Sequence, residues 1–458
     1  MVKGKKTRTD VLVIGGGVSG AVAAITGKSF YLTKKFTLIR KESAVIDACS
    51  IPYVFGPDGD TSQILVSDDA LNKMGITIET DEVVSIDQVN RICQTAGGLE
   101  ISFDKLILTL GSVPKIPDWL EGTTMENVFT ITKDYQYIQR MVTALSSARD
   151  VVIAGGGFVG FETAYELIQP DRQVTVVEAQ PHLMGIAFDG EIGDKAQAVL
   201  EQRGIKVKCG IEVTGVTGET RATGVLLSNG ETLNADALIL ATGYEPQTYL
   251  AAEAGIGVGE TGAIPVDQYM RTTNPDILAA GDCAETRCFL TGRANRVMLA
   301  STACSEARIA AINLYQLSAV MTFTWTVPIF CTAVGDTAFG AAGLTEKMAR
   351  DMKFSIYTAT STGVDKHPAS LPNAHEQTIK LIVSRNSGMI LGGEVVGGAS
   401  TGELTNLIGY AIQNRMTVNS LLIGQVGTHS LLTAHPVAYP LDVAALTIAQ
   451  RLWKISSD

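Results

Sequence analysis

The sequence is poor in charged residues, and basic residues are the scarcer kind. Only 18% of its 458 residues are charged, and 36 Lys and Arg against 47 Asp and Glu leave a formal net charge of −11 at pH 7. Nucleic acids and anionic membrane surfaces both attract clustered Lys and Arg, so we expect neither as a partner. The sequence also lacks an uninterrupted run of about 18 apolar residues, which argues against a membrane-spanning helix.

Paired cysteines are lacking as well. The seven cysteines are odd in number and include no Cys-x-x-Cys pair, so they do not form the framework typical of small secreted domains. We therefore expect a protein of the reducing cytoplasm. Cys283 and Cys288 have a Cys-x4-Cys spacing, but no second pair completes a zinc site, and we predict no metal centre. The four cysteines in other apolar segments are expected to be core residues: Cys93, Cys209, Cys304 and Cys331.

Glycine, by contrast, is abundant and unevenly placed. The chain has 46 glycines, and the segment VLVIGGGVSG (11–20) recurs as VVIAGGGFVG (151–160), each an apolar strand followed by Gly-x-Gly-x-x-Gly and a helix. In such a turn the first glycine allows the tight turn, the second lets the backbone approach a pyrophosphate, and the third lets helix and strand pack closely. Two motifs in the same context predict two dinucleotide sites, each at a helix N-terminus. The predicted contact glycines are Gly15, Gly17 and Gly20 at the first site and Gly155, Gly157 and Gly160 at the second.

The strand that follows each glycine turn ends in a different kind of residue. After the second turn it ends in Glu178, which is placed to accept the adenosine ribose hydroxyls. That carboxylate favours NADH over NADPH, because it would repel a 2′-phosphate. After the first turn the matching residue is Arg40, with Glu42 two residues later. We keep two interpretations of Arg40, a contact to a phosphate of the ligand or an ordinary surface arginine, and we count both residues as cofactor-binding candidates.

A third element identifies the ligand of the first site. Three apolar strands end in glycine turns: LILTLGSVP (106–114), LILATGYEP (238–246) and TTNPDILAAGDCAE (272–285). Together with the two glycine turns they resemble the flavoprotein family that binds two dinucleotides. The resemblance implies that Asp282 binds the ribityl chain of a flavin, and that the strands ending at Gly111 and Gly243 connect the two nucleotide-binding domains. It therefore implies FAD at the first site and NADH at the second.

The same landmarks predict three domains and an α/β fold. We predict a discontinuous FAD domain (1–118 and 252–325), an NADH domain inserted within it (119–251) and a C-terminal domain (326–458). The first two are Rossmann-like. The third begins with alternating β-rich segments, contains an Asn-Ser-Gly hairpin turn at residues 386–388 and ends in helical patterns. It resembles the C-terminal α+β dimerisation domain of pyridine nucleotide-disulfide oxidoreductases, which implies a homodimer.

One cysteine has a position that suggests chemistry. In the disulfide-reductase branch of this family a Cys-x4-Cys pair follows the FAD ribose strand, whereas IDACSIPYVFG (46–56) has Cys49 alone. This segment resembles the single-cysteine branch, which includes coenzyme A disulfide reductases, NADH oxidases and peroxidases, and persulfide or polysulfide reductases. The usual CGIPY motif has Ser50 here in place of glycine. A lone thiolate beside a flavin can cycle through a mixed disulfide, a persulfide or a sulfenic acid, and a helix N-terminus would favour the thiolate. The alternative is a buried, inert cysteine.

The residues that distinguish the members of this branch do not all point to the same kind of enzyme. Oxidases and peroxidases commonly have a histidine two residues before the third glycine of the FAD turn, where this chain has Val18. Asn295 matches an asparagine near the coenzyme A site of the disulfide reductases, and Arg293 and Arg296 are candidate phosphate contacts, or else members of a solvated loop. Leu371 stands where those reductases have a tyrosine.

The C-terminal domain and the NADH turn add four candidates. Tyr439 corresponds to a second substrate-binding tyrosine of the coenzyme A disulfide reductases. His435 matches the His-Pro of paired-cysteine reductases, whose histidine acts as an acid-base group across the dimer, although a packing role is the alternative. Phe158 matches an aromatic that shields the flavin, and Glu162 matches an acid near the nicotinamide. Core or helix-surface roles are the alternatives for both.

These observations predict an FAD-dependent NADH oxidoreductase that reduces a small disulfide, persulfide or polysulfide of a coenzyme A-type thiol through Cys49. One alternative is an NADH oxidase or peroxidase that uses a Cys49 sulfenic acid. Another is a non-thiol flavoprotein subunit that relays electrons to a protein partner. A thiol-dependent enzyme needs Cys49, whereas a relay does not.

Overall fold

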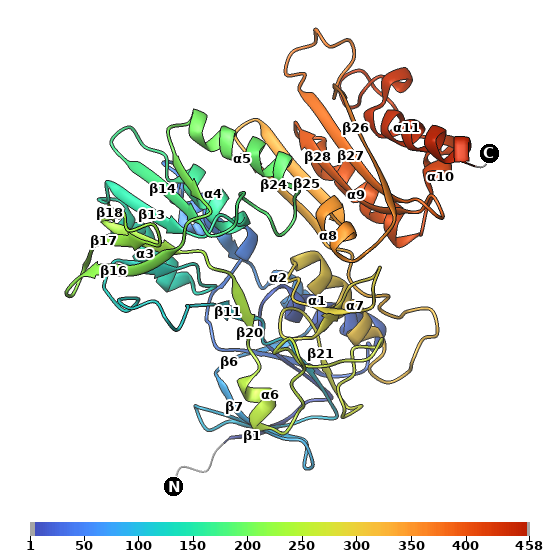
Figure 1. Cartoon of the computed structure of the whole chain (residues 1–458). Helices are drawn as coiled ribbons and strands as arrows, with labels where there is room; N and C mark the ends of the chain where they lie inside the picture. Colours follow the sequence, from blue (N-terminus) through green and yellow to red (C-terminus); the bar gives the residue numbers. More distant parts are fainter. Residues whose placement is uncertain (1–4, 456–458) are drawn as a thin grey trace. The chain divides into compact units, whose positions relative to one another are not determined.

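Residues 5–455 are described by a computed structural model of the chain, drawn in Figure 1. These residues divide into two compact units. Unit 1 consists of residues 5–148 and 239–326, and unit 2 consists of residues 149–238 and 327–455. The two glycine turns therefore lie in different units, and the unit of the second turn also contains the C-terminal part of the chain. The finer division at residues 118, 251 and 325 stays a prediction.

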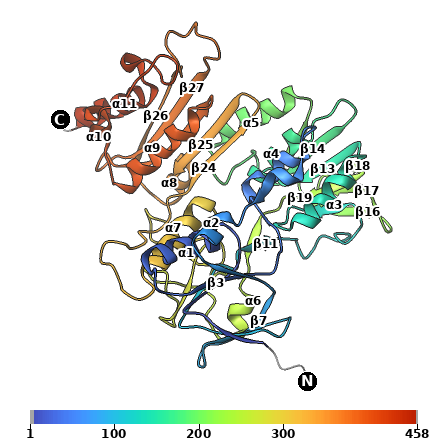
Figure 2. The same ribbon diagram turned by 180° about the vertical axis from the view of Figure 1, so that it is seen from behind.

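Unit 1 is built around a parallel sheet with the strand order β21-β10-β2-β3-β6. Its strands are β2 (Val11–Ile14), β3 (Phe36–Arg40), β6 (Thr77–Thr80), β10 (Lys105–Leu108) and β21 (Ile277–Ala279). Every residue of β2 and β3 is buried, as expected for parallel strands that are covered on both faces. Helix α1 (Val18–Phe30) follows β2 and packs against α7 (Ala300–Ile312), and the two helices lie side by side in Figure 2.

The remaining elements of unit 1 are short. A second sheet has the order β1-β9-β8-β7, and two-stranded ribbons pair β4 with β5, β11 with β20 and β22 with β23. The bounds of these strands are β1 (Lys6–Arg8), β4 (Val45–Ile46), β5 (Leu65–Val66), β7 (Val83–Asp87), β8 (Ile92–Thr95), β9 (Glu100–Ser102), β11 (Ser112–Pro114), β12 (Val128–Thr130), β20 (Tyr244–Pro246), β22 (Thr286–Arg287) and β23 (Ala294–Asn295). The helices are η1 (Ala48–Phe55), η2 (Thr61–Ile64), α2 (Asp69–Lys73), α3 (Tyr135–Leu145) and α6 (Tyr249–Glu253).

Unit 2 begins with a second strand-turn-helix arrangement. The parallel strands β13 (Asp150–Ala154), β14 (Gln173–Glu178) and β15 (Lys206–Cys209) pair in that order, and α4 (Phe158–Glu166) and α5 (Gly190–Gln202) follow β13 and β14 along the chain. An antiparallel sheet then orders β16 (Val213–Gly218), β17 (Ala222–Leu227) and β18 (Thr232–Asn234). Strand β19 (Ala237–Leu240) spans the point where the chain returns to unit 1.

The C-terminal part of unit 2 is an antiparallel sheet with helices against it. The strand order is β24-β25-β28-β27-β26, with α9 packed on β25 and β28 and α11 on β26 and β27. The bounds are β24 (Ile329–Val334), β25 (Thr337–Gly343), α8 (Glu346–Asp351), β26 (Ile356–Val364), β27 (Glu376–Ser384), β28 (Ile390–Gly397), α9 (Thr401–Gln413), α10 (Val418–Ile423), η3 (Pro436–Ala438) and α11 (Pro440–Ile455). The predicted hairpin at residues 386–388 joins β27 to β28, and Gly388 has a φ of 70°. The predicted α/β class with a C-terminal α+β domain is confirmed.

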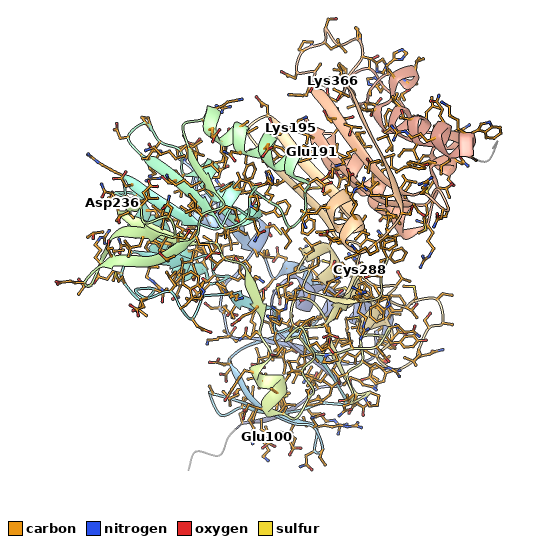
Figure 3. All side chains as sticks on the ribbon, in the orientation of Figure 1. Glu100, Glu191, Lys195, Asp236, Cys288 and Lys366 are labelled. Carbon is orange, nitrogen blue, oxygen red and sulfur yellow. The ribbon has the colours of Figure 1, made fainter. Side chains whose placement is uncertain are left out.

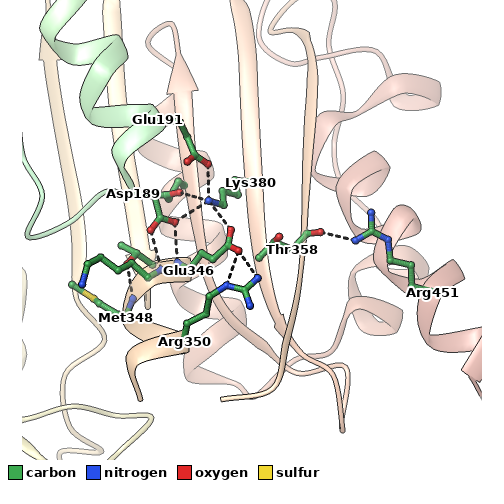
Figure 4. A network of polar contacts seen from close by, with 11 residues as sticks. Asp189, Glu191, Glu346, Met348, Arg350, Thr358, Lys380 and Arg451 are labelled. Carbon is green, nitrogen blue, oxygen red and sulfur yellow. Dashed lines mark hydrogen bonds and ion pairs between the residues drawn. The ribbon is translucent and has the colours of Figure 1, made fainter. Parts of the chain in front are cut away.

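A buried lysine joins the two parts of unit 2. Lys380 on β27 is 6% exposed, and its Nζ lies 2.9 Å from Asp189, 2.6 Å from Glu191, 3.0 Å from Glu346 and 3.9 Å from Glu394 (Figure 4). The Asp189 N–H donates to Glu394 Oε1 at 2.6 Å. Burial, reinforced by the charge of Asp189, raises the pKa of Glu394 to about 8. The start of α5 is thereby fixed to β27, β28 and α8.

Helix α5 makes a further contact with the same sheet. Figure 3 labels Glu191 and Lys195, which both project from this helix, and Lys195 Nζ lies 3.5 Å from Thr378 Oγ1. Within residues 5–455, no helix is long and apolar enough to cross a membrane.

The cysteine predictions need one correction. Cys93 is buried as expected, and so are Cys283 and Cys288. Cys331 is exposed on the edge strand β24, in a stretch where exposed and buried residues alternate. The sequence showed an apolar segment but not which face of the strand its cysteine would occupy. Cys209 and Cys304 are half-buried.

Candidate active site

The first glycine turn has the geometry of a dinucleotide cradle. Gly15 has a φ of 114°, and a Cβ at this position would lie 2.1 Å from the carbonyl oxygen of Thr109. A Cβ on Gly20 would lie 1.9 Å from the Gly15 carbonyl oxygen, so α1 can approach β2 only with glycine there. Gly17 is the N-cap of α1 and receives no side-chain cap from the described residues, and a Cβ on it would meet no atom within 4 Å. Uncapped N–H groups facing open space fit a pyrophosphate.

The second glycine turn repeats this geometry. Gly155 has a φ of 112°. Gly157 caps α4 with φ −71° and ψ −173°, against φ −69° and ψ −173° for Gly17. A Cβ on Gly157 would likewise have no neighbour within 4 Å, counting every described residue. The two turns therefore offer the same backbone site to a pyrophosphate.

Glu178 closes the second turn. Its Oε2 accepts the Gly156 N–H at 2.5 Å, and its Oε1 accepts the Gln180 N–H at 2.7 Å. These bonds fix the carboxylate beside the turn, at the end of β14, where it can also accept ribose hydroxyls. Its predicted role at the NADH site fits this placement.

Arg40 takes the corresponding position at the first turn. A Cβ on Gly16 would meet the Arg40 side chain, just as one on Gly156 would meet Glu178. The Arg40 side chain is 6% exposed and forms a bidentate ion pair with Asp68, at 2.6 and 2.7 Å. Arg40 is therefore not a surface side chain. Its Nη2 also donates to the Ser43 carbonyl oxygen at 3.4 Å, and its Nε is buried without a hydrogen-bond partner within residues 5–455. Glu42 is exposed.

Asp282 lies at the end of β21 in the same unit. Its Oδ2 accepts hydrogen bonds from Ser112 Oγ at 2.7 Å and from Lys133 Nζ at 2.9 Å. Residues 112–114 pair antiparallel with residues 244–246, directly after Gly111 and Gly243, whose φ angles are 73° and 97°. The short strands that follow these two glycines therefore lie side by side, and β11 contributes Ser112 to the Asp282 site.

Cys49 is exposed and is the second residue of η1. The N-cap of this helix is Asp47, whose Oδ1 accepts the Cys49 N–H at 3.1 Å and whose Oδ2 accepts the Ser50 hydroxyl at 2.6 Å. Buried Ile51 and Val54 anchor the helix in unit 1. Cys49 thus lies in the first turn of a helix, which is a 3-10 helix. Ser50, which replaces the family's glycine, helps to hold the capping carboxylate.

The start of α4 presents an aromatic and an acid. The rings of Phe158 and Phe330 are stacked, with centroids 5.1 Å apart and an interplanar angle of 10°. One turn along, Glu162 Oε1 accepts the Thr332 hydroxyl at 2.6 Å. Burial raises the pKa of Glu162 to about 7, against the opposing effect of the Thr332 bond. Glu162 can therefore change its charge at neutral pH.

The predicted coenzyme A residues lie on one hairpin of unit 1. Arg293 and Arg296 are exposed. Asn295 is half-buried on β23, and its Oδ1 accepts the Val297 N–H at 3.1 Å. Asn295 and Arg296 also line a small cavity that Asp282 shares. The hairpin thus places Arg296 and Asn295 beside the Gly281–Asp282 turn, within one unit.

His435 and Tyr439 flank the short helix η3. His435 is exposed, and its Nδ1 accepts the Val437 N–H at 3.1 Å, so the neutral ring carries its proton on Nε2. The His367 ring lies edge-on to it, with centroids 5.1 Å apart. Burial, with a smaller contribution from Asp442, raises the pKa of Tyr439 above its usual value.

Several residues of these sites have no sequence signature. Lys133 binds Asp282, Asp68 binds Arg40, and Thr332 binds Glu162, yet none of these three belongs to a motif, and the motif that contains Ser112 did not show that it binds Asp282. Their positions follow from strand pairing and loop closure over long sequence separations. Among the described His, Cys, Asp and Glu, no group of three or more is arranged to hold a metal ion.

Comparisons with known proteins agree with this geometry. Residues 9–307 match the family described as pyridine nucleotide-disulphide oxidoreductase, and residues 329–437 match its dimerisation domain. The NADH oxidase of Methanocaldococcus jannaschii is 27% identical over 460 residues, which cover 97% of this chain and 99% of that protein. The CoA-dependent NAD(P)H sulfur oxidoreductase of Pyrococcus abyssi is 30% identical over 404 residues, which cover 87% and 88%.

A solved structure extends the likeness to the fold. The NAD-dependent persulfide reductase from A. fulgidus superposes with a TM-score of 0.89 and 26% identity, covering 96% of this chain and 83% of that one. The family uses FAD and NAD(P)H, as the two glycine turns predicted. The chain therefore belongs to the pyridine nucleotide-disulphide oxidoreductase family and is an NAD(P)H-dependent flavin oxidoreductase of the coenzyme A-disulfide or persulfide reductase or NADH oxidase type.

Proposed function

We propose that this enzyme uses NADH to reduce a small disulfide, persulfide or polysulfide through Cys49. The observation that carries the proposal is the position of Cys49, exposed at the start of η1 in the unit that holds the first glycine turn, with no second cysteine in the helix sequence ACSIPYVF. A single thiol has no helix neighbour with which to form a disulfide. A small thiol or sulfur compound must therefore take part in each cycle.

The reaction balances with one disulfide per NADH. The Cys49 thiolate attacks one sulfur of R–S–S–R′, which forms a Cys49–S–S–R bond and releases R′–S⁻. Two electrons then cleave that bond and return the Cys49 thiolate and R–S⁻. FAD, when held by the first glycine turn and Asp282, would supply these two electrons from NADH. The sum is NADH + RSSR′ + H⁺ → NAD⁺ + RSH + R′SH, and a persulfide RSSH yields RSH and H₂S.

Residues of the chain have separate parts in this scheme. Glu178 holds the adenosine ribose of NADH, and Glu162 and Phe158 border the place of its nicotinamide. His435, contributed across a homodimer, donates a proton from Nε2 to the leaving thiolate. Tyr439 lies on the same segment and borders the substrate.

A coenzyme A-type substrate is the more specific form of the proposal. Arg293 offers its cation to the substrate's phosphates, and Asn295 offers its amide on the same hairpin. The names of two relatives support this choice, because the Pyrococcus abyssi and Pyrococcus horikoshii proteins are a CoA-dependent sulfur oxidoreductase and a coenzyme A polysulfide/persulfide reductase. Arg293→Ala should raise the KM for a coenzyme A persulfide by about tenfold and leave the KM for inorganic polysulfide unchanged.

The test compares Cys49→Ser with Cys331→Ser, since both cysteines are exposed. We expect Cys49→Ser to lose at least about 100-fold in turnover with coenzyme A persulfide, coenzyme A disulfide and polysulfide, and Cys331→Ser to behave as the wild type. Flavin reduction by NADH, followed anaerobically in a stopped-flow instrument, should be unchanged in both variants. Undiminished turnover of all three acceptors by Cys49→Ser would show that the thiol is not used.

An oxidase is the second candidate, because two relatives are named NADH oxidase. Oxygen consumption and peroxide yield on the same preparation separate the two activities. The proposal expects disulfide or persulfide turnover to exceed oxygen consumption. The reverse ranking would favour an oxidase that uses a Cys49 sulfenic acid, an activity against which Val18 argues. An electron relay would be favoured if the enzyme kept full activity after alkylation of Cys49 and a partner protein co-purified with it.

A further inference from the structure

A buried carboxyl group contacts the Gly281–Asp282 turn of unit 1. Glu306 is on α7 and is 1% exposed. Its Oε2 accepts the Gly281 N–H at 2.8 Å, next to Asp282. Its other oxygen, Oε1, is buried and has no hydrogen-bond partner among the residues described. An unsatisfied buried carboxylate oxygen is costly, so this group needs a proton, a water or both.

The surroundings of Glu306 disfavour its charged form. It lines a cavity of about 10 Å³, roughly the space of one water, together with Asp282 and Arg296. Asp282 is the nearest carboxylate, and Lys133 is bound to it. Arg296 is exposed. Of the elements packed on α7, β21 has no charged residue and α1 has only Lys28, in its last turn.

These groups leave Glu306 neutral at physiological pH. Burial, reinforced by the charge of Asp282, raises its pKa to about 8, and the Gly281 N–H opposes the shift only in part. The Gly281 bond occupies Oε2, so the proton resides on Oε1, which has no partner among residues 5–455. A protonated carboxyl can donate as well as accept, and it therefore satisfies both the glycine N–H and a water in the cavity.

We propose that Glu306 is a positioning residue for FAD whose neutral carboxyl holds the Gly281–Asp282 turn in its binding conformation, so that loss of its proton weakens FAD binding. The proposal rests on FAD at the first glycine turn, and it is independent of the Cys49 chemistry.

The geometry of the turn explains why FAD and the proton are coupled. A Cβ on Gly281 would lie 2.8 Å from Ser19 Oγ, so the Gly281 turn touches the first turn of α1. A pyrophosphate at the N-terminus of α1 adds negative charge at the junction that Glu306 shares. FAD therefore binds best to the protonated form. Above pH 8 binding requires uptake of a proton, and the dissociation constant should rise by up to about tenfold per pH unit.

The experiment measures FAD binding to apoprotein by flavin fluorescence between about pH 6.5 and about pH 9.5, without NADH or acceptor. The wild type should bind FAD about fivefold more weakly at pH 9 than at pH 8, because Glu306 is already half deprotonated at its pKa of about 8. Glu306→Gln, which is neutral at every pH and keeps an acceptor for Gly281, should bind as the wild type does at pH 7 and change less than about twofold across the range. Glu394→Gln is the matched control, because it replaces a buried carboxyl of similar pKa in unit 2, and it should keep the wild-type slope.

A wild-type dissociation constant that does not change with pH, or a slope that Glu306→Gln retains, would overturn the proposal. If Glu306→Gln does not fold, calorimetry of the wild type in two buffers of different ionisation enthalpy gives the answer. At about pH 8.5 we expect net uptake of protons on FAD binding, and no uptake would overturn the proposal. Because no step involves Cys49, neither result depends on the proposed sulfur chemistry.

Discussion

The two glycine turns have the same backbone and opposite charges. Gly17 and Gly157 differ by 2° in φ and not at all in ψ, yet the next strand ends in Arg40 at one turn and in Glu178 at the other. At the second turn the carboxylate binds the backbone of its own turn and remains available to a ribose. At the first turn the guanidinium forms a bidentate pair with Asp68 and also donates to the Ser43 carbonyl oxygen. The two turns thus share one backbone geometry, and the residue at the strand end decides whether the adjacent side chain bonds the turn itself or pairs with another side chain.

The largest effects should come from placing a methyl group in each cradle. Gly17→Ala and Gly157→Ala add a Cβ that meets no protein atom within 4 Å, so both variants should fold. At a bound pyrophosphate the methyl costs roughly 1–3 kcal/mol, about 5- to 150-fold in affinity. Gly17→Ala should weaken FAD binding alone, and Gly157→Ala should raise the KM for NADH alone. Each variant is the control for the other, and a loss of FAD from Gly157→Ala would contradict the assignment of the two sites.

Removal of Asp68 should destabilise unit 1. Asp68→Asn leaves the Arg40 guanidinium, 6% exposed, without its carboxylate. Because Asp68 is itself 31% exposed, we expect a loss of about 1–2 kcal/mol in the free energy of unfolding rather than the larger cost of a fully buried pair. Urea denaturation of the apoprotein measures it. Lys41→Ala, which removes the exposed Lys41–Glu82 pair, should change stability by less than about 0.5 kcal/mol; equal losses would mean that Arg40 has no structural role.

Glu178 should affect selectivity rather than stability. Glu178→Gln keeps an acceptor for the Gly156 N–H but loses the charge, so the KM for NADH should rise about tenfold while the KM for NADPH falls. Steady-state kinetics with both nucleotides measures the ratio, and the melting temperature should stay within a few degrees of the wild type. An unchanged NADH to NADPH ratio would mean that the carboxylate does not meet the ribose.

The smallest effect concerns the pH dependence of hydride transfer. Glu162, with a pKa of about 7, is mostly neutral at pH 6 and mostly charged at pH 8, and a carboxylate stabilises the positive charge that nicotinamide gains as it loses hydride. Anaerobic flavin reduction should therefore speed up about threefold over this range. Glu162→Gln should remove the dependence. Thr332→Val removes the hydrogen bond that lowers this pKa and should move the rise to higher pH; a wild-type profile in both variants would exclude Glu162.

The sequence predicted the features that short segments encode better than it predicted contacts between distant side chains. The glycine turns, the strand ends and the start of η1 are encoded within short segments, because their geometry depends on neighbours a few residues apart. Lys133 and Asp282 are separated by 149 residues, and no periodicity announces their pairing. Cys331 shows the same limit, since its apolar segment was recognised but its face of β24 was not. The burial of Arg40 could not be predicted either, because it depends on an ion pair with Asp68, which belongs to no motif.

The Lys380 cluster has a consequence for how the protein is made. Asp189 and Glu394 are hydrogen-bonded across 205 residues, and synthesis proceeds from the N-terminus. The second nucleotide fold therefore leaves the ribosome with Asp189 and Glu191 facing no lysine, and it acquires their cation only after β27 has emerged.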